Sequence, residues 1–139
     1  MRRLSDIVLN QHPLTLPATV SVKEACQKMR DNHVGSVLVT DAKGHLAGIF
    51  TGRDAVYRVV AAGKAAGTTK VGEVMTPGPE TMSPDKTAIE ALRLMWDGGF
   101  RHIPVVRDGK ILGIVSRGDF KAHENDRLEE ERELWEHIR

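Results

Sequence analysis

The chain of 139 residues contains an internal repeat, and this feature constrains its fold more than any other. Residues 15–25 align with residues 81–91 at an offset of 66 positions. One residue is then lost in a turn, and residues 44–54 align with residues 109–119 at an offset of 65. The matched glycine, isoleucine, hydroxyl and aspartate positions across a single gap indicate a duplication.

Both copies predict the same order of secondary structure. Ser21 with Glu24, and Thr87 with Glu90, have the spacing of a capping box, which predicts that a helix begins at each place. Segments rich in β-branched residues follow each helix and precede a second one, so the repeated unit is expected to be β-α-β-β-α. The strands are expected at residues 14–16, 36–40 and 46–50 in the first copy and at 80–82, 102–106 and 111–115 in the second.

A unit of this size buries too little apolar surface to be stable alone, so the two copies are expected to fold together. The predicted fold class is α/β (α+β), with two pseudo-twofold-related β-α-β-β-α repeats packed through their sheets and an additional C-terminal helix. We expect the first repeat with its N-terminal lead-in at residues 1–62, a linker at 63–70, the second repeat at 71–123 and an amphipathic helical extension at 124–139.

Composition narrows the class of protein. The net charge of +1 gives no global sign of nucleic-acid or membrane binding, although residues 1–123 carry about +5 and residues 124–139 about −4. A single cysteine excludes an internal disulfide, and no apolar stretch approaches the length of a membrane span. We therefore expect a cytoplasmic protein whose body slightly favours anionic ligands.

The motif shared by the two copies is Gly-Ile-apolar-(Thr/Ser)-x-x-Asp, at residues 48–54 and 113–119. It places a hydroxyl and a carboxylate where a strand ends and a helix begins. The hydroxyl can donate to a phosphate, the acceptor-only carboxylate suits the two adjacent hydroxyls of a ribose, and the glycine allows close approach of a flat group. The alternative is helix capping alone, because Thr/Ser-x-x-Asp is also an ordinary N-cap sequence.

These residues resemble a tandem pair of cystathionine-β-synthase (CBS) domains, the Bateman module. The resemblance rests on residues 48–54 and 113–119, on His102-Ile-Pro104-Val-Val and on Val74-Met-Thr76-Pro, and it covers residues 4–125. It implies a regulatory sensor of adenosyl ligands in which residues of both repeats complete each site. The ribose hydroxyls would then be bound by Asp54 beside Thr51 and by Asp119 beside Ser116.

The resemblance also assigns the remaining residues of each predicted site. Residues of the second copy would complete the Asp54 site: Thr76, Thr81, Phe100, Ile103 and Pro104. Residues of the first copy would face Asp119: Asn10, Thr15, Val34 and Val37. Asn10 replaces the threonine of the family and Leu38 the proline, so the Asp119 site departs further from the family pattern. Cations for the phosphates are expected from Arg53, Arg101, His102 and Arg117.

The sequence therefore predicts a non-enzymatic module that binds AMP, ADP or ATP as a regulatory ligand, forms a homodimer through its helices and signals to an effector protein. NAD and S-adenosylmethionine remain alternative ligands, and a ligand-free scaffold acting through the C-terminal helix is the alternative of another class. No catalytic cofactor and no metal site are expected, because the six histidines show no ligand spacing.

Two further features have mainly structural interpretations. Cys26 aligns with Leu92 on the apolar face of a helix, which indicates a packed core thiol rather than a redox sensor. Residues 120–139 predict one long helix with Phe120, Leu128, Leu134, Trp135 and Ile138 along one stripe. This stripe packs either on its own module or on a second protein surface.

Overall fold

The protein is described from a computed structural model, which defines the backbone of residues 1–138 and the side chains of residues 1–136. The chain forms two compact units. The first-repeat unit contains His12–Glu80 and Asp108–Ile111, and the second-repeat unit contains Met1–Gln11, Thr81–Arg107 and Leu112–Arg139. The lead-in segment 1–11 thus belongs to the unit of the second copy, whereas residues 71–80 belong to the unit of the first.

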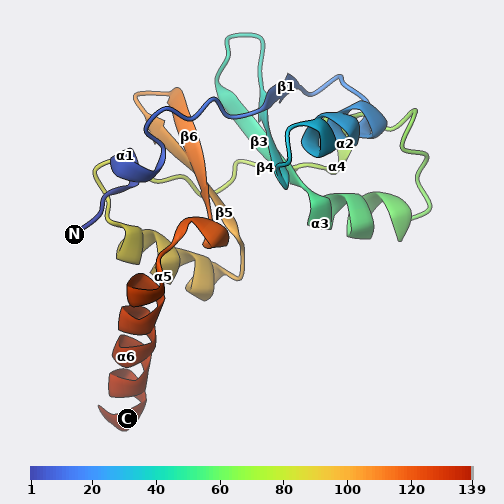
Figure 1. Cartoon of the computed structure of the whole chain (residues 1–139). Helices are drawn as coiled ribbons and strands as arrows, with labels where there is room; N and C mark the ends of the chain where they lie inside the picture. The colour runs from blue at the N-terminus through green and yellow to red at the C-terminus, as the bar shows by residue number, and fades with distance from the viewer. Residues whose placement is uncertain (139) are drawn as a thin grey trace. The chain divides into compact units, whose positions relative to one another are not determined.

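The first-repeat unit is built on a four-stranded sheet in the order β1-β2-β3-β4 (Figure 1). Strand β1 is parallel to β2, and the pairs β2–β3 and β3–β4 are antiparallel. The helices of this unit are α2, the short α3, its π-helical continuation η1, and α4. The elements are β1 (Thr15–Pro17), α2 (Val22–Asp31), β2 (Ser36–Thr40), β3 (Leu46–Thr51), α3 (Gly52–Asp54), η1 (Ala55–Val60), α4 (Val71–Val74) and β4 (Thr76–Pro77).

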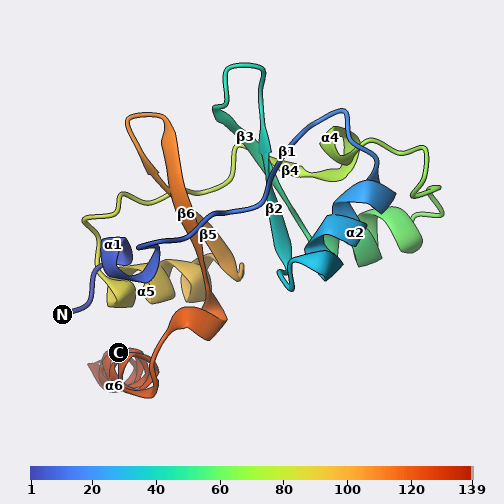
Figure 2. The same cartoon turned by 45° about the horizontal axis from the view of Figure 1, so that its top comes forward.

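The second-repeat unit has the same order of elements around a two-stranded sheet, β5–β6. Met82 forms an isolated parallel bridge to Val105 at the place where the first copy has β1. Helix α1 lies against α5 in both Figure 1 and Figure 2, and the Leu4 amide donates to the Lys86 carbonyl just before α5. The elements are α1 (Leu4–Ile7), α5 (Ala88–Gly98), β5 (His102–Arg107), β6 (Lys110–Ser116), the 3₁₀ turn η2 (Arg117–Asp119) and α6 (Ala122–Ile138).

The predicted signals at the starts of the helices and in the turns are observed. The Ser21 hydroxyl accepts a hydrogen bond from the Glu24 amide, and Thr87 and Glu90 form a reciprocal capping box. The turn between β5 and β6 has positive φ at Asp108 (52°) and Gly109 (77°), as a two-residue hairpin turn requires. The four main strands and both capped helices were therefore predicted correctly.

Each unit has its own hydrophobic core, made almost entirely of aliphatic side chains. The first is centred on Val22, Val37, Val39 and Phe50, and the second contains α1, α5 and the β5–β6 hairpin around Leu4, Leu92, Met95, Ile103 and Val105. Each core side chain of this kind contributes roughly 1.5–3 kcal/mol by leaving water. These cores fix the sheets from which the repeated motifs project.

Candidate functional site

The first repeated motif forms a tight corner between β3 and α3, which we call the Asp54 corner. One carboxylate oxygen of Asp54, Oδ2, accepts hydrogen bonds from the Thr51 amide (2.9 Å) and the Thr51 hydroxyl (3.2 Å). The Asp54 amide in turn donates to Thr51 Oγ1 over 3.4 Å. The capping alternative is thus realised, and it occupies only one of the two oxygens of the carboxylate.

The second motif forms the Asp119 corner between β6 and η2. Here Oδ2 of Asp119 accepts from the Ser116 amide (2.7 Å) and the Ser116 hydroxyl (3.2 Å). Ser116 and Thr51 both have extended backbone, with φ near −121° and ψ near 166°. The two corners therefore have the same local geometry although the residues between hydroxyl and carboxylate differ.

The second carboxylate oxygen distinguishes the corners. Oδ1 of Asp54 lies 3.6 Å from Nε of Arg58, and the Asp54 side chain is 12% exposed. The Arg58 Nη1 donates to the carbonyls of Val74 (3.3 Å) and Met75 (2.9 Å), the residues just before Thr76. The Asp119 carboxylate forms no ion pair with the residues that the structure describes. Each corner thus keeps a second carboxylate oxygen outside the hydrogen bonds of its own motif, and the charge at Asp54 is partly neutralised by Arg58.

The arginines within the two motifs are held by aromatic rings. The Arg53 guanidinium lies 5.4 Å from the centroid of the Tyr57 ring, and both side chains are exposed. The Arg117 guanidinium lies 4.6 Å from the Trp96 ring and donates from Nη2 to the Met95 carbonyl at 3.3 Å. The Arg117 Nε is buried without a hydrogen-bond partner among the described residues. The two motif arginines are therefore held by aromatic rings, Arg53 exposed to water and Arg117 half-buried.

The other predicted residues of the first-repeat unit differ in exposure. Thr76 is half-buried in β4 and pairs with Ile49, two residues before Thr51 on β3. Thr15 on β1 is exposed, and Val34 is 42% exposed. Val37 is completely buried in the core of its unit, so its side chain is committed to packing. The structure thus places Thr51 and Thr76 on the neighbouring strands β3 and β4, with Asp54 in α3 directly after β3.

Most of the predicted residues of the second-repeat unit lie at or just before the start of β5. Thr81 and Arg101 are exposed, and the Arg101 carbonyl accepts a hydrogen bond from the Arg117 amide (3.2 Å). Phe100 and His102 are half-buried, whereas Ile103 and Pro104 are buried. Asn10 is exposed and has a left-handed backbone with φ of 67°. The completion of each site by residues of the other copy stays a prediction.

The glycines at residues 48 and 113 are explained by packing of the chain itself. A Cβ atom on Gly48 would lie 2.8 Å from the Thr76 carbonyl oxygen, and one on Gly113 would lie 2.6 Å from Oε1 of Gln11. The Gln11 Oε1 accepts from the Ile114 amide at 2.9 Å, so a side chain of the lead-in segment takes the place that β4 has in the first copy. These contacts, rather than the approach of a flat ligand, account for the two glycines.

Four residues near the corners were not identified from the sequence: Arg2, Arg58, Trp96 and Glu124. Arg58 lies four residues after Asp54 on one helix, a spacing at which opposite charges meet, so this pair was open to prediction. Arg2 and Glu124 are paired over 2.7 Å across 122 positions of the sequence, and no local pattern indicates such a contact.

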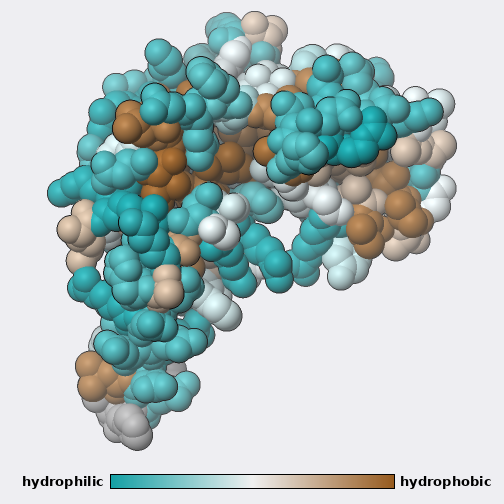
Figure 3. Space-filling view, viewed as in Figure 1, coloured by the Kyte–Doolittle hydropathy of each residue, from teal (hydrophilic) through white to brown (hydrophobic). Residues whose placement is uncertain are grey.

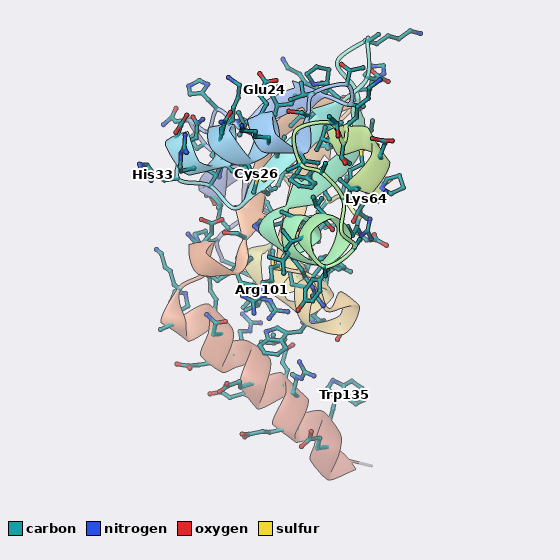
Figure 4. All side chains as sticks on the ribbon, turned by 90° about the vertical axis from the view of Figure 1, so that its right-hand side faces the viewer. Glu24, Cys26, His33, Lys64, Arg101 and Trp135 are labelled. Carbon is teal, nitrogen blue, oxygen red and sulfur yellow. The ribbon has the colours of Figure 1, made fainter. Side chains whose placement is uncertain are left out.

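The lone thiol and the C-terminal helix agree in part with the expectations. Cys26 is half-buried on α2, and burial raises its pKa, which keeps the thiol protonated (Figure 4).

Phe120 and Leu128 are buried, whereas Leu134 and Trp135 are 61% and 68% exposed, so only the first half of the predicted stripe packs on its own unit. The Ile138 side chain and Arg139 lie outside the described residues.

The described residues support neither a metal site nor a membrane-spanning helix. They contain no group of three or more histidine, cysteine, aspartate or glutamate side chains that could hold a metal ion. No helix within residues 1–138 is both long and apolar enough to cross a membrane.

Comparison with known proteins identifies the family. The sequence model of the family described as "CBS domain" matches residues 4–61 and 71–125. The chain belongs to the CBS domain family. It is a tandem CBS pair with a mixed α/β fold and a C-terminal helix, and most of α6 lies beyond the second CBS domain. CBS pairs of this kind are typically non-catalytic regulatory modules.

Relatives of the CBS pair occur in long and short proteins. YlbB of Bacillus subtilis is 39% identical over 105 residues, which are 75% of this chain and 70% of that protein. The CBS domain-containing protein CBSCBSPB1 of Arabidopsis thaliana is 38% identical over 102 residues, which are 73% of this chain. The chain spans about a fifth of the length of CBSCBSPB1 and of the similar Arabidopsis proteins CBSCBSPB2 and CBSCBSPB3.

Solved structures of other CBS proteins have the same fold. A CBS-domain protein of Burkholderia ambifaria has a TM-score of 0.80 and 30% identity, covering 84% of this chain and 89% of that one. The CBS protein PAE2072 of Pyrobaculum aerophilum, solved in complex with AMP, has a TM-score of 0.80 and 24% identity over 91% and 97% of the two chains. The CBS pair of protein MJ0100, solved with 5′-methylthioadenosine and S-adenosyl-L-methionine, has a TM-score of 0.76 and 26% identity over 84% and 94%.

Proposed function

We propose that this CBS pair is a sensor of adenine nucleotides, AMP, ADP or ATP, which bind at the Asp54 and Asp119 corners and act as regulatory ligands. The observation that carries the proposal is the arrangement of each carboxylate. Its Oδ2 is bound by the amide and hydroxyl of the same corner, so its direction is fixed. The remaining Oδ1 can accept hydrogen bonds from the 2′ and 3′ hydroxyls of a ribose.

The charges around the corners support an anionic ligand. Arg53 lies between Thr51 and Asp54 in the sequence and Arg117 between Ser116 and Asp119, so each motif itself carries a guanidinium. Arginine binds phosphate oxygens through paired donors, and such charge-assisted bonds are roughly twice as strong as neutral ones. Adenosine, with the diol alone, would therefore bind more weakly than the phosphorylated nucleotides.

The related structures support the adenosyl class of ligand. One CBS protein with this fold was solved with AMP and another with two sulfur-containing adenosyl ligands. S-adenosylmethionine has the same ribose diol but a cationic sulfonium in place of phosphate. The basic side chains at both corners thus favour a nucleotide over S-adenosylmethionine.

Isothermal calorimetry with AMP, ADP, ATP, NAD and S-adenosylmethionine tests this proposal. We expect micromolar binding of at least one adenine nucleotide and its loss in the double variant Asp54→Asn/Asp119→Asn. Asp97→Asn, a change of an exposed aspartate on α5, is the matched control and should bind as the unaltered protein does. Absence of binding by all five compounds would refute the sensor, whereas preference for S-adenosylmethionine would change its ligand.

We also propose that the protein forms a homodimer through its helices. The helix after the Asp54 corner exposes three large apolar side chains, Val56 (55%), Tyr57 (63%) and Val60 (75%), and hydrophobic atoms gather over it in Figure 3. Such a surface on a charged protein is typical of an interface. Sedimentation velocity should show a dimer that Val60→Asp dissociates by at least about tenfold in Kd, while Lys64→Asp leaves it intact. A monomeric unaltered protein would contradict this proposal.

A further inference from the structure

The start of α6 is joined to the Asp119 corner by one arginine of the lead-in segment. The Arg2 Nη2 donates both to the Asp119 carbonyl (2.8 Å) and to Oε1 of Glu124 (2.7 Å) in the first turn of α6. The Arg2 Nε donates to the other oxygen of Glu124 over 3.3 Å. Glu124 is only 3% exposed and also accepts from the Lys121 amide (2.8 Å). A single guanidinium thus fixes the corner and the beginning of the helix together.

A second connection leads through the ring of Trp96 on α5. The Arg117 guanidinium lies 4.6 Å from the ring centroid, and that of Arg132 on α6 lies 5.3 Å from the same centroid. An ion pair between Arg93 and Glu131 (2.8 Å) holds the same stretch of α6 to α5. The side chain that follows Ser116 in the motif therefore shares a ring with the middle of α6.

Arg117 is incompletely satisfied in this arrangement. Its Nε is buried without a partner in the described part of the chain, and the hydrogen bond from its Nη2 to the Met95 carbonyl is long, at 3.3 Å. A phosphate group beside the corner offers two charged acceptors to such a guanidinium, a stronger interaction than a cation–π contact. A bound phosphate thus competes directly with the Trp96 ring for Arg117.

We propose that α6 is the output element of the Asp119 corner, and that a nucleotide phosphate releases α6 by drawing Arg117 away from Trp96. This inference rests on the proposed nucleotide binding and concerns a helix that lies mostly beyond the CBS pair. Without Arg117 against it, the Trp96 ring loses the packing that holds it under Arg132. When the middle of α6 leaves α5, the exposed end of the helix moves with it. Trp135 projects from this end in Figure 4. By linkage, docking of α6 weakens nucleotide binding by the same factor.

Hydrogen exchange of the α6 amides tests the coupling on the full chain, with calorimetry on the same samples. Saturating ATP should accelerate exchange along α6 by at least about fivefold, whereas saturating adenosine, which has the diol but no phosphate, should not. Arg117→Leu should accelerate exchange without ligand and abolish the ATP effect. Arg107→Leu, which breaks an exposed ion pair with Asp85 (2.7 Å) in the same unit, should change neither.

The outcomes separate this inference from the proposed function. Nucleotide binding with unchanged α6 exchange overturns the coupling and leaves the sensor in place. An equal effect of adenosine and ATP also overturns it, because the phosphate would then have no part. If no nucleotide binds, both proposals fail. The comparison of ATP with adenosine needs no variant, so misfolding of Arg117→Leu cannot obscure the result.

Discussion

The Asp54 and Asp119 corners have the same hydrogen bonds within the motif but different partners outside it. At Asp54 the helix that follows places Nε of Arg58 3.6 Å from Oδ1 of the carboxylate itself. At Asp119 the outside contact comes from Arg2 and is made to the main-chain carbonyl (2.8 Å), which leaves the carboxylate unpaired within the described residues. Duplication has thus kept the hydrogen bonds within the motif and varied the contacts that support it.

The elements that follow the corners explain this difference. After Asp54 the helix continues as η1, so Arg58 comes round to the carboxylate one turn later. The turn η2 ends at Asp119 itself. The next residue, Phe120, has extended backbone, and α6 begins separately at Ala122. The position aligned with Arg58 is His123, which lies on a different helix. The carboxylate of the Asp54 corner is therefore contacted by its own helix, whereas the Asp119 corner is connected through Arg2 to the start of a separate helix.

The largest expected effect is on the stability of the Asp119 corner. Arg2→Ala leaves the buried Glu124 carboxylate without its cation, so we expect the free energy of unfolding to fall by about 3 kcal/mol. Arg107→Ala breaks the exposed pair with Asp85 and should cost less than about 1 kcal/mol. Urea denaturation measures both. Equal effects of the two variants would show that Arg2 does not hold the corner.

The next largest effect distinguishes the two corners as ligand sites. An asparagine at either place can keep the local bonds through its carbonyl but presents an NH₂ group, not an acceptor, to the diol. We expect Asp119→Asn to weaken nucleotide binding by at least about tenfold, and Asp54→Asn by about threefold because Arg58 already engages that carboxylate. Calorimetry on the single variants measures this order. A reversed order would show that the Arg58 pair does not limit the Asp54 corner.

Much of the fold could be predicted because its signals are local. The hydroxyl of Ser21 or Thr87 and a carboxylate three residues later specify where α2 and α5 begin. Asp108-Gly109 specifies a hairpin because the turn requires positive φ. The repeat supplied the rest, since each copy confirms the boundaries of the other. The hydroxyl–carboxylate geometry of both corners followed from the same spacing.

The remaining features depend on contacts that leave no local pattern. The amides at the start of α1 bond to the carbonyls of Pro84 and Lys86, so the lead-in segment folds onto the second copy although it precedes the first. Val37 occupies the core within β2, whose residues 36–39 are all buried, so no alternation along this strand separates packing side chains from ligand-facing ones. The contacts of Arg2 and Trp96 join segments that only tertiary packing brings together.

The pH dependence of stability gives a smaller effect at the Asp119 corner. Burial opposes ionisation of Glu124, but the bonds from Arg2 and the Lys121 amide and the charges of Arg2 and His123 outweigh it and lower the pKa. The ionised form therefore stabilises the fold fully above the ordinary glutamate pKa of about 4.3, and this contribution is lost as the pH falls through the lower folded value. Denaturation of Glu124→Gln should accordingly lose part of the acid dependence below about pH 4.3. Glu136→Gln, an exposed change on the same helix, should keep it; an unchanged slope in Glu124→Gln would refute the assignment.

The smallest expected effect comes from removing the Arg58 cation, which distinguishes the Asp54 corner from the Asp119 corner. Arg58→Gln, made in the Asp119→Asn background so that only the Asp54 corner binds, frees Oδ1 of Asp54 from its cation. Because this pair is half-exposed and worth less than about 1 kcal/mol, nucleotide affinity should rise by only about threefold. Arg30→Gln, on the surface of α2 in the same unit, is the control and should leave the affinity unchanged. A fall in affinity would instead mean that Arg58 binds the ligand's phosphate, and the Asp54 corner would then need its own helix to complete the site.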